Sequence, residues 1–204
     1  ASHVLTVRAS ESDGPGTDTA TVTITVTDVD EFDPEFGLED YPATVREDIA
    51  DTVVIATVSA TEGDLTGTVS YAITDGNAGG LFEVDAATGT VSLAAGKRLD
   101  AETATSHVLT VTASESDGSG TDTATVTITV TDVDEFNPVF GADDYPATVA
   151  ENIADTVVIA TVAATEGDLT GTVSYAITDG NTGGLFEVNA TTGEVSLAAG
   201  KSLD

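Results

Sequence analysis

The chain contains two copies of one sequence. Residues 2–100 return almost unchanged at 106–204, and comparing 1–100 with 105–204 position by position gives 85 identities and 15 differences. Nearly every residue therefore has a twin, which leaves little room for one unique catalytic site. Each copy has the usual size of a domain and can bury its own core. The repeat predicts an array of similar domains whose function depends on the joints between them.

Alternating apolar and polar residues predict β-strands throughout the repeat. In residues 121–133, apolar residues at 124, 126, 128 and 130 alternate with threonine, as in a strand with one buried and one wet face. Val54 and Val58 are expected to face the core in another strand. The remaining predicted strands cover residues 41–45, 54–60, 69–73, 82–84, 91–93 and 107–113. Seven short strands separated by glycine-rich turns predict an all-β fold: seven-stranded Greek-key β-sandwich repeats stacked end to end in a rod.

Two acidic segments that end in proline mark the expected joints, at 28–34 and 132–138. Proline cannot donate to a strand ladder and so ends it. We therefore expect the last two strands of one repeat at 1–33, a complete repeat at 34–137, and the first five strands of a further repeat at 138–204. Together the two partial repeats correspond to one unit without residues 101–104.

The charge excludes several classes of partner. With 36 acidic and 5 basic residues, the formal net charge is −31. Phosphate groups require the opposite sign, so neither nucleic acid nor an anionic membrane surface is expected as a partner. No apolar run reaches the ~18 residues of a membrane-spanning helix, so membrane insertion is not expected either. The absence of cysteine excludes thiolate sites, and a bound metal would be a hard cation held by oxygen atoms.

Several motifs resemble one known family. They lie at residues 71–77, 82–91 and 99–102, and the acidic segments continue into Pro34-x-Phe36 and Pro138-x-Phe140. Together they resemble the cadherin repeat over the whole chain. The absence of cysteine and the closeness of the copies look more like the cadherin-like extender repeats of large bacterial surface adhesins.

The resemblance implies Ca²⁺ at each joint, about three ions per joint, held by oxygen ligands. At the joint after residues 34–137, the implied ligands are the side chains of Glu47, Asp100, Glu102, Asp134, Glu135, Glu166 and Asp168 and the backbone carbonyls of Val133 and Phe136. At the joint before those residues, they are Asp30, Glu31, Glu62, Asp64 and Glu115 with the carbonyls of Val29 and Phe32. In the partial repeats, the matching residues are Glu11, Glu151 and Asp204.

Electrostatics supports the same expectation independently. Two carboxylates 5 Å apart repel by about 3 kcal/mol at an effective dielectric of 20. A cluster of several would push a joint open unless a cation screens it. We therefore expect calcium to convert a flexible string of repeats into a stiff rod, and to stabilise the fold by binding only the folded state.

Alternative roles for these residues fit the sequence less well. Charge-driven solubility is the main alternative for the joint carboxylates. An EF-hand at Asp28, Asp30 and Asp33 lacks the glycine at its sixth position and the flanking helices. Paired carboxylates can hydrolyse glycosides, but here they recur in each repeat, and the chain has no tryptophan. His3 and His107 are copies of one strand position and are expected to pack there. Neither the carboxylates nor the histidines therefore indicate a catalytic site, and no enzyme activity is expected.

Two functions fit an array of this kind. The first is a structural spacer that projects the binding region of an adhesin away from a bacterial cell surface, with neighbouring repeats of the same polypeptide as its partners. The second is an adhesion module that binds a protein or a carbohydrate directly. Near-identity of the copies favours the spacer, and threonine-rich faces offer few aromatic anchors for a direct ligand.

Overall fold

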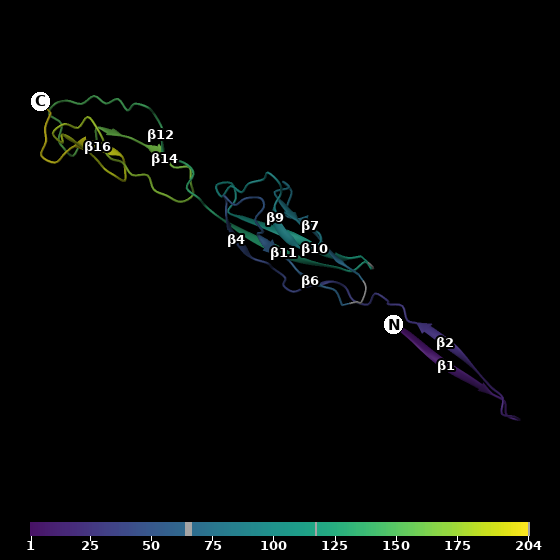
Figure 1. The fold of residues 1–204 in the computed structure, drawn as a ribbon. Helices are drawn as coiled ribbons and strands as arrows, with labels where there is room; N and C mark the ends of the chain where they lie inside the picture. The colour runs from purple at the N-terminus through teal and green to yellow at the C-terminus, as the bar shows by residue number, and fades with distance from the viewer. Residues whose placement is uncertain (64–66, 117, 204) are drawn as a thin grey trace. The chain divides into compact units, whose positions relative to one another are not determined.

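The computed structural model describes residues 1–63, 67–116 and 118–203 as an all-β chain (Figure 1). These residues form strands, turns and loops but no helix, so none of them forms a helix able to cross a membrane. The chain divides into two compact units. The first consists of Ala1–Ala43, Asp51–Lys97 and Val108–Thr127, and the second of Thr44–Ala50, Arg98–His107 and Ile128–Asp204.

Residues 35–131, here called the central repeat, contain one four-stranded sheet and two smaller ones. The large sheet has the order β4-β11-β10-β7 and is formed by β4 (Ala43–Arg46), β7 (Val69–Asp75), β10 (Ser106–Glu115) and β11 (Thr121–Thr131). The smaller sheets are β5-β9-β8 and β3-β6, formed by β3 (Glu35–Phe36), β5 (Ala56–Thr57), β6 (Ala60–Thr61), β8 (Phe82–Val84) and β9 (Thr90–Leu93). The all-β sandwich expected from the sequence is confirmed.

The alternation in the long strands decides which face is buried. Leu109 and Val111 of β10 and Val126 of β11 are fully buried, as are Val91 and Leu93 of β9. The opposite face of β10 carries hydroxyl pairs with β7. Thr112 lies 2.9 Å from Thr74, and Ser114 lies 3.0 Å from Ser70, between hydroxyl oxygens in both cases. One face therefore makes the core, and the other is held in register by polar contacts.

The run at 54–60 differs from the expected single strand. Ala56 pairs with Val91 of β9, whereas Ala60 pairs with Phe36 of β3. The segment therefore serves two sheets and is interrupted between them. Val54, expected in the core, lies before β5 and is exposed, whereas Val58 is buried as expected.

The N-terminal hairpin consists of β1 (Ser2–Ser10) and β2 (Thr17–Thr25). The strands pair antiparallel, with Leu5 opposite Val22. Every residue of both strands is exposed.

Residues 138–203, here called the C-terminal segment, repeat the two smaller sheets of the central repeat. They contain the sheets β12-β14 and β13-β16-β15, formed by β12 (Val139–Phe140), β13 (Ala160–Thr161), β14 (Ala164–Thr165), β15 (Phe186–Val188) and β16 (Glu194–Leu197). Phe140 pairs with Ala164, as Phe36 pairs with Ala60. The segments matching β4 and β7, residues 147–150 and 173–179, do not form strands.

Candidate metal site

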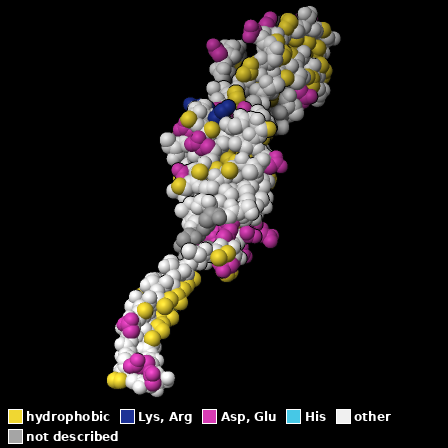
Figure 2. Space-filling view, turned by 90° about the vertical axis from the view of Figure 1, so that its right-hand side faces the viewer, with side chains coloured by type: hydrophobic (Ala, Val, Ile, Leu, Met, Phe, Trp, Pro, Cys, Tyr) yellow, Lys and Arg dark blue, Asp and Glu magenta, His cyan; other side chains and the backbone are white. Residues whose placement is uncertain are grey.

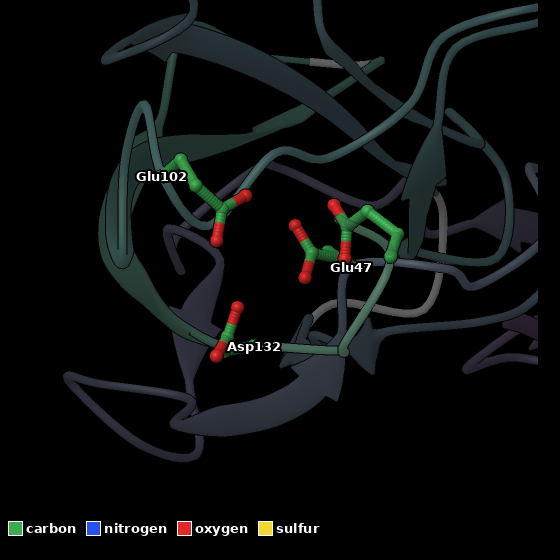
Figure 3. Close-up of side chains that lie close together, drawn as sticks. Glu47, Glu102 and Asp132 are labelled. Atoms are coloured by element: carbon green, nitrogen blue, oxygen red, sulfur yellow. The ribbon is translucent and has the colours of Figure 1, made fainter. Parts of the chain in front are cut away.

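Four carboxylates converge within the second compact unit. Glu47, Glu102, Asp132 and Glu135 each place one oxygen within 4.8 Å of the others. Glu47, Glu102 and Asp132 point toward one another across a common space (Figure 3). We call this set the four-carboxylate group.

The direction of two neighbouring strands explains why Glu47 meets Asp132. The Tyr41 amide donates to the Thr125 carbonyl at 2.9 Å, and the Glu47 amide donates to the Thr131 carbonyl at 3.1 Å. The residue numbers of donor and acceptor rise together, from 41 to 47 and from 125 to 131. The two strands are therefore parallel and end at the same edge of the sheet. Glu47 directly follows β4, and Asp132 directly follows β11.

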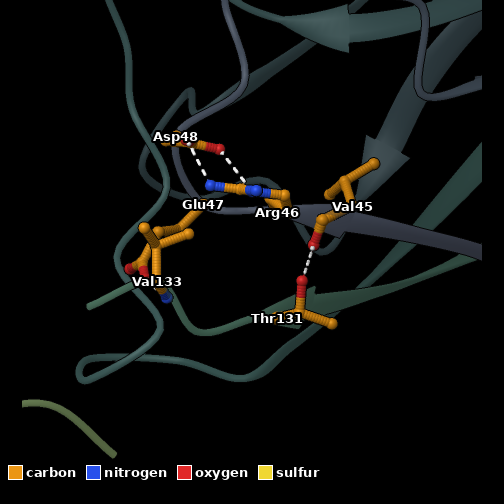
Figure 4. A network of polar contacts seen from close by, with 6 residues as sticks. All are labelled: Val45, Arg46, Glu47, Asp48, Thr131 and Val133. Carbon is orange, nitrogen blue, oxygen red and sulfur yellow. Dashed lines mark hydrogen bonds and ion pairs between the residues drawn. The ribbon is translucent and has the colours of Figure 1, made fainter.

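Glu47 anchors the site through both carboxylate oxygens. Its side chain is buried, with 6% exposed. Oε2 accepts the Ala101 amide at 2.6 Å. Oε1 accepts the amide of Val133, which lies beside Glu47 in Figure 4, also at 2.6 Å. One carboxylate therefore joins the end of β4 to the turn that carries Glu102 and to the segment after β11. The adjacent Arg46 points instead to Asp48, 2.9 Å between Nη2 and Oδ2.

The group has excess negative charge and unused acceptor oxygens. Glu102 Oε1 and Asp132 Oδ1 are buried without a hydrogen-bond partner among the described residues. Contact with the Asp132 carboxyl is the first cause that raises the pKa of Glu102, and burial and then the charge of Glu47 raise it further. Burial, followed by the charges of Glu47 and Glu102, raises the pKa of Glu135. Buried carboxylate oxygens that lack donors are suited to a hard cation.

The loop at 166–170 closes over the segment after β11. The Thr170 hydroxyl donates to Asp132 Oδ2 at 2.5 Å and lowers the pKa of Asp132, and the Thr170 amide donates to the same oxygen at 2.9 Å. Asp168 Oδ1 accepts the Glu135 amide at 3.1 Å. Asp168 therefore positions the segment that carries Glu135.

Several residues expected at this joint lie outside the four-carboxylate group. Asp100 Oδ1 accepts the Thr103 amide at 2.7 Å and so caps the turn that carries Glu102. Glu166 Oε1 accepts the amide of its neighbour Gly167 at 3.0 Å. Asp134 is exposed, and Phe136 donates its amide to Asp168.

Asp132 is the member that the sequence prediction missed. The prediction took the linker carboxylates to be Asp134 and Glu135, yet Asp132 brings a buried oxygen to the group. Its position directly after the last strand was the available signal. The sheet fixes the backbone of a residue at the end of a strand, but it does not fix the backbone of residues further along the linker.

The first compact unit contains a second acidic cluster around Glu115. This residue is buried, and its Oε1 accepts the Gly120 amide at 2.6 Å. Burial comes first among the causes that raise its pKa, and contact with Glu62 and the charge of Asp30 raise it further. Asp30 also lies against the turn at Gly118, where an added Cβ would clash with Asp30 Oδ2. The cluster brings together three residues expected at the joint before residue 34.

The other residues expected to bind calcium are more dispersed. Val29, Glu31 and Phe32 are exposed, and the Phe32 ring packs against Gly63. Glu11 accepts the Gly16 amide at 2.6 Å within its own hairpin. Glu151 is exposed. Asp64 and Asp204 lie outside the described residues.

Comparison with known proteins identifies the repeat. The family model for the cadherin domain matches residues 41–131, a range that includes Glu47 and Glu102. Residues 41–131 form a cadherin repeat. Cadherin domains bind Ca²⁺ in general, and the four-carboxylate group is an acidic cluster of the kind that such binding requires.

Cadherin relatives match most of this chain. Human Protocadherin Fat 1 is 33% identical over 175 residues, which is 83% of this chain but 4% of the relative. Cadherin EGF LAG seven-pass G-type receptor fmi-1 of Caenorhabditis elegans is 35% identical over 201 residues, 96% of this chain and 8% of the relative. The chain thus spans a small part of the curated relatives it matches. The crystal structure of mouse cadherin-23 EC22–24 is 28% identical, with a TM-score of 0.76 over 95% of this chain and 63% of that one.

Proposed function

We propose that this chain is a calcium-rigidified extracellular spacer, built of cadherin repeats that hold the binding region of an adhesin away from a cell surface. The pair of buried, unpartnered oxygens on Glu102 and Asp132 carries the proposal. In a group of four acids these oxygens are stable together only when protons or a cation neutralise them. Near neutral pH, a divalent cation is the better fit.

Glu47, Glu102, Asp132 and Glu135 form the proposed core of the calcium site. Calcium supplies positive charge and a demand for six to eight oxygen ligands. Glu47 holds the end of β4 to the segment after β11 through the Val133 amide, and to the turn that carries Glu102 through the Ala101 amide. We propose that the further ligands at this joint are Asp100, Asp134, Glu166, Asp168 and the carbonyls of Val133 and Phe136. Together with the four-carboxylate group they would hold about three ions.

The cluster of Asp30, Glu62 and Glu115 is the proposed calcium site of the preceding joint. We propose that one complete repeat, residues 34–137, lies between the two joints. Two acidic joints one repeat apart are what a regular spacer requires. The absence of cysteine and the near-identity of the copies support a bacterial surface adhesin as the parent protein. The relatives named above are animal proteins, so they support the cadherin repeat but not a bacterial source.

Calorimetric titration with calcium tests the site. We expect wild-type protein to bind several ions, and Asp132→Asn to weaken binding about tenfold or more, since the change removes a ligand charge. Asp143→Asn is the matched control, because this exposed aspartate is not a member of the four-carboxylate group. Equal affinities in both variants and wild type would remove Asp132 from the site.

Small-angle scattering tests the spacer function. The maximum dimension is measured in calcium and again after a chelator is added. We expect the maximum dimension to change when calcium is removed. We also expect the scattering in chelator to indicate a more flexible chain, because the carboxylates then repel one another. An unchanged profile would refute calcium-dependent stiffening. Specific binding of a glycan or protein by a single repeat would favour the adhesion module instead.

A further inference from the structure

The turn between β15 and β16 contains a pattern that the spacer function does not require. Its sequence Asn189-Ala190-Thr191 matches Asn-x-Ser/Thr, the acceptor pattern for N-linked glycans. The chain has four other asparagines, and none of them is followed two residues later by serine or threonine. The acceptor pattern therefore occurs once in this chain.

The turn is closed by hydrogen bonds of Asn189. Its amide donates to the Glu194 carbonyl at 2.8 Å, and its carbonyl accepts the Gly193 amide at 2.9 Å. Its side-chain Oδ1 accepts the Thr191 and Thr192 amides at 2.9 and 3.1 Å. Among the described residues, the side-chain nitrogen Nδ2 makes no hydrogen bond. The fold therefore uses the oxygen of this side chain and leaves available the nitrogen to which a glycan would be attached.

Asn181 shows the opposite case, an asparagine that the fold uses at both ends of its amide. Its Nδ2 donates to the Phe186 carbonyl at 2.7 Å, and its Oδ1 accepts the Phe186 amide at 3.0 Å. Asn77 makes the same two contacts with Phe82 in the central repeat. These two asparagines hold the loops before β15 and β8, whereas Asn189 keeps one end of its amide unused.

The turn is exposed in a complete repeat as well as in the C-terminal segment. All of residues 189–192 are exposed, and so are their counterparts, residues 85–88. The counterpart turn is closed in the same way, since Asp85 Oδ1 accepts the Ala87 and Thr88 amides at 2.9 and 2.8 Å. The central repeat includes β10 and β11 in its large sheet. Exposure of this turn is therefore a property of the whole sandwich.

The acceptor pattern arises from differences between the two copies. Three differences lie within residues 189–194, although only 15 of the 100 compared positions differ. They place Asn189 for Asp85, Thr191 for Ala87 and Glu194 for Thr90. Neither of the first two changes alone would create the acceptor pattern, and both are present.

The fold accounts for Asn189 but not for Thr191. Either aspartate or asparagine supplies the side-chain oxygen that such a turn needs. The described part of the chain offers the Thr191 hydroxyl no hydrogen-bond partner, and Ala87 closes the same turn without a hydroxyl. Charge gives no reason either. Glu194 restores the negative charge lost with Asp85, and acidic side chains lie at several other places on the surface (Figure 2).

We propose that Asn189 is an attachment site for an N-linked glycan, which an oligosaccharyltransferase transfers from a lipid-linked oligosaccharide diphosphate. Nδ2 of Asn189 forms a bond to the anomeric carbon of the first sugar and loses a proton to a base of the transferase. The bond between that carbon and the diphosphate oxygen breaks, and the lipid diphosphate leaves. The hydroxyl of Thr191 completes the pattern that the transferase recognises. The glycan then projects into solvent from the β15–β16 turn.

Modification of the purified full-length chain in vitro tests the site. In the organism the reaction rests on the extracellular location proposed above, but the purified reaction does not, and so a negative result counts against the site and not against the spacer. The reaction contains a single-subunit bacterial oligosaccharyltransferase and its lipid-linked oligosaccharide. Such enzymes also require an acidic residue two positions before the asparagine, and Glu187 supplies it.

Intact-mass spectrometry measures the result. We expect wild-type protein to gain the mass of one glycan, and fragmentation to locate that glycan on Asn189. Asn189→Gln should gain none. An unmodified wild-type chain, in a reaction that fully modifies an acceptor peptide, would refute the proposal.

A matched pair of variants separates the acceptor pattern from general accessibility. Thr191→Ala and Thr192→Ala each remove one exposed hydroxyl from the same turn, but only the first destroys the pattern. We expect Thr191→Ala to abolish modification and Thr192→Ala to retain it. Equal modification of the two variants would contradict recognition of Asn189 through this pattern.

Transfer of the pattern to the central repeat tests the contribution of the turn. Asp85→Asn combined with Ala87→Thr produces the same triplet in a turn with the same hydrogen bonds, and Glu83 supplies the acidic residue. We expect this double variant to carry two glycans per chain, and Asp85→Asn alone to carry one. A double variant with a single glycan would refute the inference that this turn presents the pattern to the transferase.

Discussion

The hairpin at residues 2–27 and the hairpin at residues 106–131 have almost the same sequence and opposite environments. Both form two antiparallel strands with apolar residues on one face. In the central repeat that face is buried against a second layer, whereas in the N-terminal hairpin it is exposed. Local sequence is therefore sufficient for strand pairing and for the choice of face. Burial depends on a second layer that the hairpin does not encode.

The largest expected difference between the two hairpins concerns one core position. Ile128 is fully buried and Ile24 is 44% exposed. We expect Ile128→Ala to lower the free energy of unfolding of the central repeat by about 2–5 kcal/mol, because it leaves a cavity. Ile24→Ala should change it by less than about 0.5 kcal/mol. Urea denaturation at low protein concentration measures both, and a similar loss in both variants would show that the hairpin packs on the central repeat.

The next difference concerns a carboxylate and its twin. Glu47 accepts two backbone amides, whereas Glu151, at the same place in the next copy, is exposed. A glutamine at position 47 has only one acceptor oxygen, so one buried amide would lose its partner. We expect Glu47→Gln to lower the free energy of unfolding by about 2 kcal/mol and Glu151→Gln to leave it unchanged. Thermal unfolding in chelator measures this cost without calcium, and equal melting temperatures would contradict it.

The smallest difference appears as a pH dependence. Hydrogen bonds from Thr125 and Thr127 lower the pKa of Asp40 below its ordinary value of 3.8. Since the folded pKa is below the unfolded one, the stabilisation is present above the unfolded pKa and is lost as pH falls through the folded pKa. Asp40→Asn should therefore lower the urea midpoint slightly at neutral pH, with the deficit shrinking at acidic pH. Asp144→Asn is the control and should show no such trend, because Asp144 is exposed and the change leaves the hydrogen bonds of Asp40 with Thr125 and Thr127 intact. A pH-independent deficit in Asp40→Asn would argue against the mechanism.

Most of the sandwich could be predicted because period-2 alternation reports directly on a two-faced strand. The prediction was correct for β11, where each apolar position from Ala124 to Val130 is buried. It was wrong for Val54, since a continuous apolar pattern cannot show that a segment leaves one sheet and joins another. Only the pairings of Ala56 and Ala60 with different strands reveal that interruption.

The candidate site was predicted less completely than the fold. The motifs indicated Glu47, Glu102 and Glu135, which the structure brings together. They did not indicate Asp132, whose contribution depends on β4 and β11 running in the same direction and ending at one edge. A spacing in the sequence cannot report that direction when the strands are more than seventy residues apart, as Arg46 and Thr121 are.

The sequence by itself determined the repeat, the all-β class, the face of each long strand that is apolar, and the acidic character of the joints. These properties follow from residue type and from periods of two residues along the chain. The tertiary structure decided which of two nearly identical hairpins is buried and which carboxylates share a site. Both outcomes depend on segments distant in sequence, because an apolar face is buried only where a second layer covers it, and carboxylates become a metal site only where separate strands end together.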